Sequence, residues 1–223
     1  MGDILSTYGS QILSAFGTTL LLAILATIGS LLLGTLVAVL RLSPVAVLRL
    51  LGTWYVNTFR NTPLTLLMVA SILGITFILG INLDPSSIKG NAFRWAVVML
   101  SVYHGAFVCE ALRSGVNTIP AGQAEAARAI GLTFGQSMRE VLLPQAFRGA
   151  VAPLGSVLIA LIKNTTVAAV IGVAEAANLM SVIIDNKGSG ISIFLIFALG
   201  FVILTLPLGV FLTSLSRRLA VKR

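Results

Sequence analysis

The chain has 223 residues, of which 57% are hydrophobic and only 10% are charged. This composition is too apolar for a soluble globular domain and indicates a protein embedded in lipid. The 15 basic residues outnumber the 7 acidic ones, but no basic run with interleaved aromatic residues occurs, so a nucleic-acid partner is not expected. One cysteine, one histidine and no clustered carboxylates also leave no metal site and no catalytic set.

Charge-free stretches mark the expected membrane spans, because a spanning helix needs ~20 mostly apolar residues and a charge at the bilayer centre is costly. The sequence predicts about five spans in one transmembrane domain over 1–223, near 14–40, 63–82, 93–113, 150–172 and 192–214. The segments 41–60 and 114–149 are predicted as loops between them. The expected fold class is therefore all-α, a polytopic membrane helical bundle.

Basic residues set the expected orientation, because they resist translocation and are retained in the cytosol. Eleven fall on one side of the predicted spans: Arg41, Arg49, Arg60, Arg113, Arg128, Arg139, Arg148, Arg217, Arg218, Lys222 and Arg223. Lys89, Arg94 and Lys187 fall on the other side, and Lys163 falls inside a span. This bias predicts an external N-terminus, a cytosolic C-terminus and two cytosolic loops.

Polar residues flank the second and third spans. Residues 60–62, Arg-Asn-Thr, precede Pro63, which suits the first turn of a helix. An N-terminal capping role explains this polar group. Glu110, at the cytosolic end of the third span, lies one turn from Arg113 and is interpreted as a gate or as a support for the next loop. His104 is interpreted as a buried core histidine in preference to a proton relay.

The loop over 114–149 is too long for a bare connector and predicts two short helices that meet at a corner. Pro120 suits the first turn of a helix, and the helix formers that follow it continue to Gly131, a residue suited to ending a helix. Thr133 and Gln136 have the spacing of a capping box, and the second helix is expected to end before Pro144. The result is a helix-turn-helix on the cytosolic side.

The surface of this helix-turn-helix admits two interpretations. Small residues permit close approach by a partner protein, and apolar residues beside them are expected to be exposed, which favours a docking surface. These residues are Ala124, Ala126, Ala127, Ala129, Leu132 and Phe134. An amphipathic helix pair resting on the membrane surface is the alternative.

Several motifs give this chain a resemblance to a known family. Glu125-Ala126-Ala127, Gly131 and residues 141–144, Val-Leu-Leu-Pro, resemble the EAA loop of ATP-binding-cassette importer permeases, in which Val141 replaces the usual isoleucine. Three further stretches resemble the polar amino-acid branch of that family: Arg-Asn-Thr-Pro-Leu at 60–64, Glu-Ala-Leu-Arg-Ser-Gly at 110–115 and Lys-Asn-Thr-Thr at 163–166. The likeness covers nearly the whole chain and is greatest to actinobacterial glutamate-importer permease subunits, which share the closing Arg-Leu-Ala-Val-Lys at 218–222.

The resemblance implies a type I importer permease fold and half of a translocation pathway for a polar amino acid, with glutamate expected. It implies that residues 120–135 form a coupling helix that inserts into a separate ATP-binding subunit. The coupling residues carried over are Glu125, Ala126, Ala127, Gly131, Leu132, Phe134 and Pro144. Since the chain contains no Walker A loop, ATP and Mg²⁺ are expected on that partner, and the chain itself is expected to bind no cofactor and to be no enzyme.

The implied partners are a dimer of ATP-binding subunits, a second and related permease subunit, and an extracellular binding protein that contacts residues 173–190. The implied location is the inner or plasma membrane of a bacterium. A self-sufficient secondary transporter is the alternative, which five spans without an obvious inverted repeat make weaker.

Ionisable and polar residues within the spans are the candidates for the pathway, because their desolvation must be offset by a partner or a water-filled cavity. These candidates are Lys163, Asn164, Thr165, Thr166, Glu110 and Arg60. Lys163 and its neighbours either meet the carboxylate of the amino acid, or Lys163 is a structural cation bonded to helix carbonyls or to a neighbouring acid. The threonines and Asn164 are suited to satisfying backbone groups where the helix is perturbed.

Overall fold

The computed structural model describes residues 2–187 and 190–219, and within these ranges the chain is helical and contains no strand. Lys222, Arg223 and most of the closing Arg-Leu-Ala-Val-Lys stretch lie outside the described residues. In chain order the elements are α1 (Gly2–Leu42), α2 (Ala46–Asn61), α3 (Leu64–Ala70), η1 (Ser71–Ile78), α4 (Ile88–Asn117), α5 (Ala121–Ala129), α6 (Phe134–Gln136), η2 (Ser137–Leu142), α7 (Leu143–Asn164), η3 (Thr165–Ile171), α8 (Ala176–Lys187) and α9 (Gly190–Leu219). The segments η1 and η2 are π-helical, and η3 is a 3₁₀ helix.

Four helical stretches are long and apolar enough to cross a membrane: Ile4–Leu42, Ile88–Asn117, Ser137–Ile171 and Gly190–Arg218. The pair formed by α2 with α3 and η1 passes the same test only when its two arms, bent by 98°, are taken together. The described residues therefore hold four or five candidate spans.

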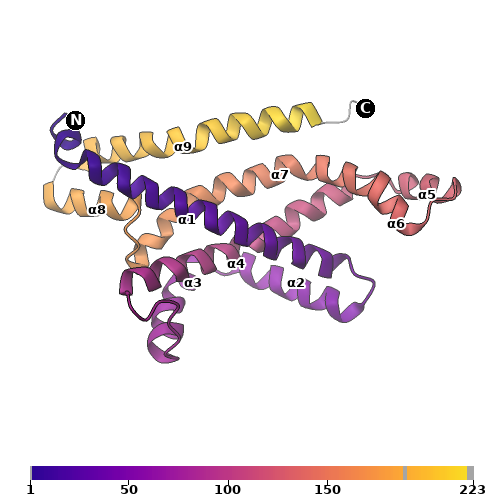
Figure 1. The fold of residues 1–223 in the computed structure, drawn as a ribbon, viewed down its shortest axis with the longest axis horizontal. Coiled ribbons are helices and arrows are strands. Elements are labelled where there is room, and N and C mark those ends of the chain that lie inside the picture. Colours follow the sequence, from indigo (N-terminus) through magenta and orange to yellow (C-terminus); the bar gives the residue numbers. More distant parts are fainter. Residues whose placement is uncertain (1, 188–189, 220–223) are drawn as a thin grey trace.

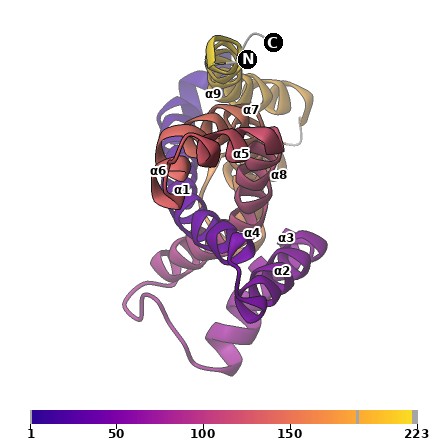
Figure 2. The ribbon, with the colours of Figure 1, turned by 90° about the vertical axis from the view of Figure 1, so that its right-hand side faces the viewer.

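The helix α4 packs against α1, α2 and α7, whereas α9 packs against α7 and α8. Figure 1 shows α8 and the first turns of α1 at one end of the molecule, and α5 and α6 at the other. Viewed from that second end, α5 and α6 stand in front of the bundle, whereas α2 and α3 lie to one side (Figure 2). The helix-turn-helix thus projects from the end opposite α8.

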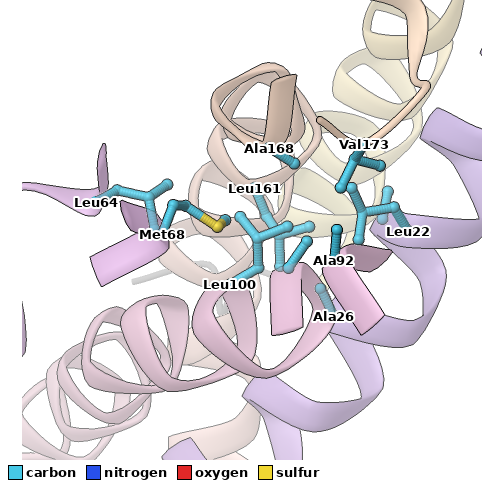
Figure 3. Close-up of a cluster of buried hydrophobic side chains, with 11 residues drawn as sticks. Leu22, Ala26, Leu64, Met68, Ala92, Leu100, Leu161, Ala168 and Val173 are labelled. Atoms are coloured by element: carbon cyan, nitrogen blue, oxygen red, sulfur yellow. The ribbon is translucent and has the colours of Figure 1, made fainter. Parts of the chain in front are cut away.

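The largest buried cluster lies where α1, α3, α4, α7 and η3 converge. Leu22 and Ala26 from α1 meet Leu100 from α4 and Leu161 from α7, while Met68 reaches in from α3 (Figure 3). Many other large apolar side chains are exposed, among them nine along α9, although Ile193 and Phe197 of that helix are buried. An apolar exterior around a small core suits contact with lipid and with other transmembrane helices.

Close packing of α1 on α4 depends on the glycines at 29 and 34. A Cβ atom added to Gly29 would lie 2.8 Å from Ser101 Cβ and closer still to Ser101 Oγ. A Cβ atom added to Gly34 would lie 2.5 Å from Val108 Cβ and 2.7 Å from the Gly105 carbonyl oxygen. Since one of these atoms belongs to the backbone, the two helices have no room for a side chain here.

Gly34→Val is expected to destabilise the protein by about 3 kcal/mol, the upper end for an overpacked core, because α1 must move away from α4. The thermal unfolding midpoint of the purified protein in detergent measures this effect. Gly17→Val is the matched control on the same helix, since a Cβ at Gly17 meets nothing within 4 Å. Equal midpoints for the two variants would contradict a tight α1–α4 contact.

The predicted loop over 41–60 is wrong, because residues 46–61 form α2. Arg49 and Arg60 interrupt the apolar run in the sequence, but both lie near the helix ends, where charged groups are tolerated. Arg49 Nη1 donates to the Pro44 carbonyl at 2.7 Å, before the helix begins, and Arg60 stands in the last turn. The charges of Arg49 and Arg60 near the ends of α2 therefore made its apolar middle look like part of a loop.

The capping interpretation of residues 60–62 is also wrong. Asn61 Nδ2 donates to the Asn57 carbonyl at 2.7 Å and Thr62 Oγ1 donates to the Thr58 carbonyl at 2.8 Å, so both side chains bond back to α2. Thr62 is extended, as expected of a residue before proline, and the chain bends there. The polar group thus ends α2 and does not begin α3.

The second helix of the 114–149 loop was expected to end before Pro144, and this too is wrong. Helical residues continue from Phe134 through η2 into α7, with Pro144 in the first turn of α7. The wider turn of the π segment, in which the Leu143 N–H bonds to the Met138 carbonyl, gives the proline ring the space that an α-helical turn denies it. The helix-turn-helix is therefore joined to α7 without a break.

Candidate functional site

The corner between α5 and α6, residues 120–136, is closed by local chemistry, and we call it the elbow. Gly131 has φ +85°, in the left-handed region that favours glycine. Its N–H donates to the Arg128 carbonyl at 3.0 Å, and the Leu132 N–H donates to the Ala127 carbonyl at 3.1 Å. These two bonds make up a Schellman motif, the usual end of a helix at glycine.

A capping box begins the second half of the elbow, as predicted. Gln136 N–H donates to Thr133 Oγ1 at 3.3 Å, and the Thr133 N–H donates back to Gln136 Oε1 at 2.9 Å. Free backbone donors at the start of α6 are thereby satisfied. The corner thus has defined geometry although the segment makes few contacts with the rest of the chain.

The predicted coupling residues take different positions on the elbow. Glu125 and Ala126 are exposed on α5, whereas Ala127 is buried and Leu132 is half-buried. The side chain of Phe134 lies outside the described residues. Among the apolar side chains of the elbow that the structure describes, Ile130 at the tip is the most exposed, at 78%, and the sequence prediction missed it.

Glu110 on α4 forms ion pairs with three arginines, which lie on α1, α2 and α4 itself. We call these four residues the charge cluster. Arg41, at the end of α1, is the closest partner of Glu110 Oε1; Arg113 Nη1 lies 3.5 Å away and Arg60 Nη1 lies 4.0 Å away. The Arg41 side chain is only 12% exposed, whereas that of Arg60 is 45% exposed. Three guanidinium groups and one carboxylate leave a net charge of +2.

A cavity of about 340 Å³ lies between α4 and α7, beside the charge cluster. Its lining residues are Tyr103, His104, Phe107, Ser156, Val157, Ala160 and Asn164. The Arg60 guanidinium lies over the Phe107 ring, 5.6 Å from its centroid, which connects the cavity to the cluster. His104 is buried, and its Nε2 lies 3.2 Å from Asn164 Nδ2.

The structure separates the residues of the 163–166 stretch. Asn164 lines the cavity, but Lys163 is exposed and, among the described residues, forms no ion pair. Thr165 Oγ1 donates to the Ile162 carbonyl at 2.7 Å and Thr166 Oγ1 donates to the Lys163 carbonyl at 2.8 Å. These bonds occur where α7 tightens into η3, as expected for hydroxyls that stabilise a perturbed helix.

Residues 30–221 match the family described as binding-protein-dependent transport system inner membrane components. The chain belongs to this family. It is thus a permease component of a transport system in the inner membrane. Such a component is not an enzyme: it works with ATPase and permease partners, and ATP hydrolysis belongs to the separate ATPase.

Individual relatives of this permease agree with that assignment. It is 51% identical over 178 residues to the glutamate transport system permease protein GluC of Corynebacterium glutamicum, covering 78% of each chain. It is 33% identical over 169 residues to a probable glutamine ABC transporter permease of Bacillus subtilis, covering 76% of this chain and 74% of that one. A crystal structure of an amino acid ABC transporter with histidines superposes with a TM-score of 0.87 at 28% identity, over 96% of both chains. The predicted type I importer permease fold is confirmed.

At the end opposite the elbow, the permease has a buried acid that the sequence analysis did not single out. Glu175 is fully buried, and its carboxylate accepts from the Ala177 and Asn178 N–H groups at 2.9 and 2.8 Å, which caps α8. Burial raises the pKa of Glu175, whereas the two backbone N–H groups oppose that rise. The Ala176 N–H donates to Thr19 Oγ1 at 3.1 Å and thereby fixes α8 to α1. An acid directly before a run of helix formers was the available signal.

Proposed function

We propose that this permease forms half of the pathway of an ATP-driven importer for a polar amino acid, with glutamate as substrate. The elbow carries the proposal: it is a corner of defined geometry, formed by the EAA motif, that projects from the end of the bundle and exposes Glu125 and Ile130. A separate ATPase with a complementary groove is the partner that such a knob fits. That partner binds ATP and Mg²⁺.

The proposed orientation places the elbow in the cytosol and the N-terminus and α8 outside. Basic residues support it, since the elbow and the helix ends that adjoin it carry Arg113, Arg128, Arg139 and Arg148. The helix α8, capped by Glu175 and fixed to α1, is then the external surface for a substrate-binding protein. A second, related permease subunit completes the pathway, as the resemblance to two-permease glutamate systems implies.

Within the membrane, we place the amino acid at the cavity between α4 and α7. Asn164 and two aromatic rings line this cavity, and Arg60 stands beside it with a loosely held guanidinium. The net charge of +2 in the charge cluster favours an anionic substrate over a cationic one. A glutamate substrate also agrees with the name of the relative that is 51% identical, a glutamate transport system permease protein.

The complete complex tests the function. We expect that the purified assembly of both permeases and the ATPase, in lipid nanodiscs, hydrolyses ATP several-fold faster when a binding protein loaded with glutamate is added. Glutamine and arginine, each with its own binding protein, are the comparison ligands. If ATP hydrolysis rises with glutamine or arginine but not with glutamate, the assignment of glutamate as the substrate is wrong. Uptake by the permeases without any ATPase would overturn the importer mechanism in favour of secondary transport.

A further inference from the structure

The hydrogen bonds of His104 fix which of its ring nitrogens carries the proton. Its Nδ1 lies 3.1 Å from the Leu100 carbonyl oxygen, which can only accept, so Nδ1 must be the donor. In the uncharged ring, Nε2 is then an acceptor. Its neighbour at 3.2 Å is Asn164 Nδ2, the donor end of the amide. The two bonds are mutually consistent and leave the buried ring with no unused polar atom.

This arrangement also fixes the orientation of the Asn164 amide. Because Nδ2 lies against His104 Nε2, the amide oxygen Oδ1 is the end turned away from His104, and Asn164 is one of the residues that line the cavity. No hydrogen bond reaches Oδ1 from another side chain or backbone group in the described ranges. The cavity wall thus offers an acceptor of fixed position.

The chemistry around that acceptor matches an ammonium group. Tyr103 and Phe107 line the same cavity with their ring centroids 5.1 Å apart, and aromatic faces attract cations. A carbonyl oxygen beside aromatic rings therefore accepts from and stabilises a positive donor. Arg60, whose guanidinium lies over the Phe107 ring, suits the carboxylate of the same molecule.

We infer that His104 is a positioning residue: it holds the Asn164 amide so that Oδ1 receives the α-ammonium group of the transported amino acid. This inference rests on the proposed function, because it places the substrate in the cavity between α4 and α7. It also predicts a source of substrate specificity: the permease itself distinguishes an amino acid from its deaminated analogue, independently of the binding protein.

The test compares ligands that differ only in the amino group. In nanodiscs that hold the permease–ATPase complex without binding protein, calorimetric titration at millimolar concentrations measures the Kd of L-glutamate and of glutarate. We expect the wild type to prefer glutamate by about tenfold or more, the usual range for a hydrogen bond to a charged group. His104→Phe and Asn164→Leu should bring this ratio close to one. His104→Gln, which supplies both a donor and an acceptor, should restore the preference.

A matched control and a second ligand pair separate the outcomes. Ser101→Ala removes another buried polar group of α4, whose hydroxyl donates to the Val97 carbonyl, and should leave the ratio unchanged. A folded His104→Phe complex that keeps the wild-type ratio, or that weakens both ligands equally, overturns the inference. L-glutamine and glutaramate repeat the comparison: if only this pair binds and shows the preference, glutamate is the wrong substrate but His104 keeps its role. If neither amino acid binds the wild type, the cavity assignment and this inference both fail.

Discussion

Gly131→Val is expected to reduce ATP-coupled uptake to background while the protein still folds and inserts. Gly131 has φ +85°, a conformation that costs an L-residue about 1–2 kcal/mol and a β-branched residue more. The elbow makes few contacts with the bundle, so it relieves this strain by changing its own shape. The Schellman bonds to Arg128 and Ala127 are then lost, and Glu125 and Ile130 no longer present one surface to the ATPase.

Uptake of radiolabelled glutamate in membrane vesicles measures this effect, and copurification of the ATPase shows whether docking fails. Gly122→Ala and Gly135→Ala are the matched controls, because both glycines lie in helical turns of the elbow with nothing within 4 Å of an added Cβ. These two variants should transport normally. Normal uptake by Gly131→Val would remove the elbow from the coupling mechanism.

Glu110→Gln should destabilise the permease by roughly 3 kcal/mol, because it leaves a buried guanidinium without its counter-charge. Arg41 is the residue most affected, since its side chain is 12% exposed and its nearest acceptor is Glu110 Oε1. Arg60 and Arg113 lose the same carboxylate, so three positive charges then repel one another. The thermal unfolding midpoint in detergent should fall accordingly.

Two comparisons identify the charge cluster as the cause. Glu140→Gln breaks an ion pair with Arg139 whose side chains are 66% and 86% exposed, and it should cost less than about 1 kcal/mol. Adding Arg41→Met to Glu110→Gln removes the buried charge and should recover part of the loss. If Glu110→Gln and Glu140→Gln unfold at the same temperature, the cluster contributes no more than a surface pair.

Local features of the fold were predictable from the sequence. The Gly131 corner and the Thr133–Gln136 capping box need only residues within a few positions of one another, and both are present. The all-α membrane class followed from composition for a similar reason, since it depends on average polarity and not on which helices meet.

Features that depend on helix packing were not predictable. Arg113 could be paired with Glu110 because it is one turn away, but Arg41 and Arg60 reach the same carboxylate from other helices. The helix over 46–61 was missed because Arg49 and Arg60 were taken to mark a loop. The partner of His104 is 60 residues away, so no spacing rule could reveal the bond to Asn164.

The unbroken helical path from Ser137 to Ile171 has a mechanical consequence. It starts at the elbow, passes Pro144 without ending and carries Ser156 and Asn164 along the cavity wall. A rigid rod of this kind acts as a lever: displacement at one end must tilt or turn the other unless the rod bends. Its softest points are the π turn before Pro144 and the turn at Pro153, where backbone hydrogen bonding is weakest. Stiffening either point would change how much of a displacement at the elbow is transmitted to the cavity wall.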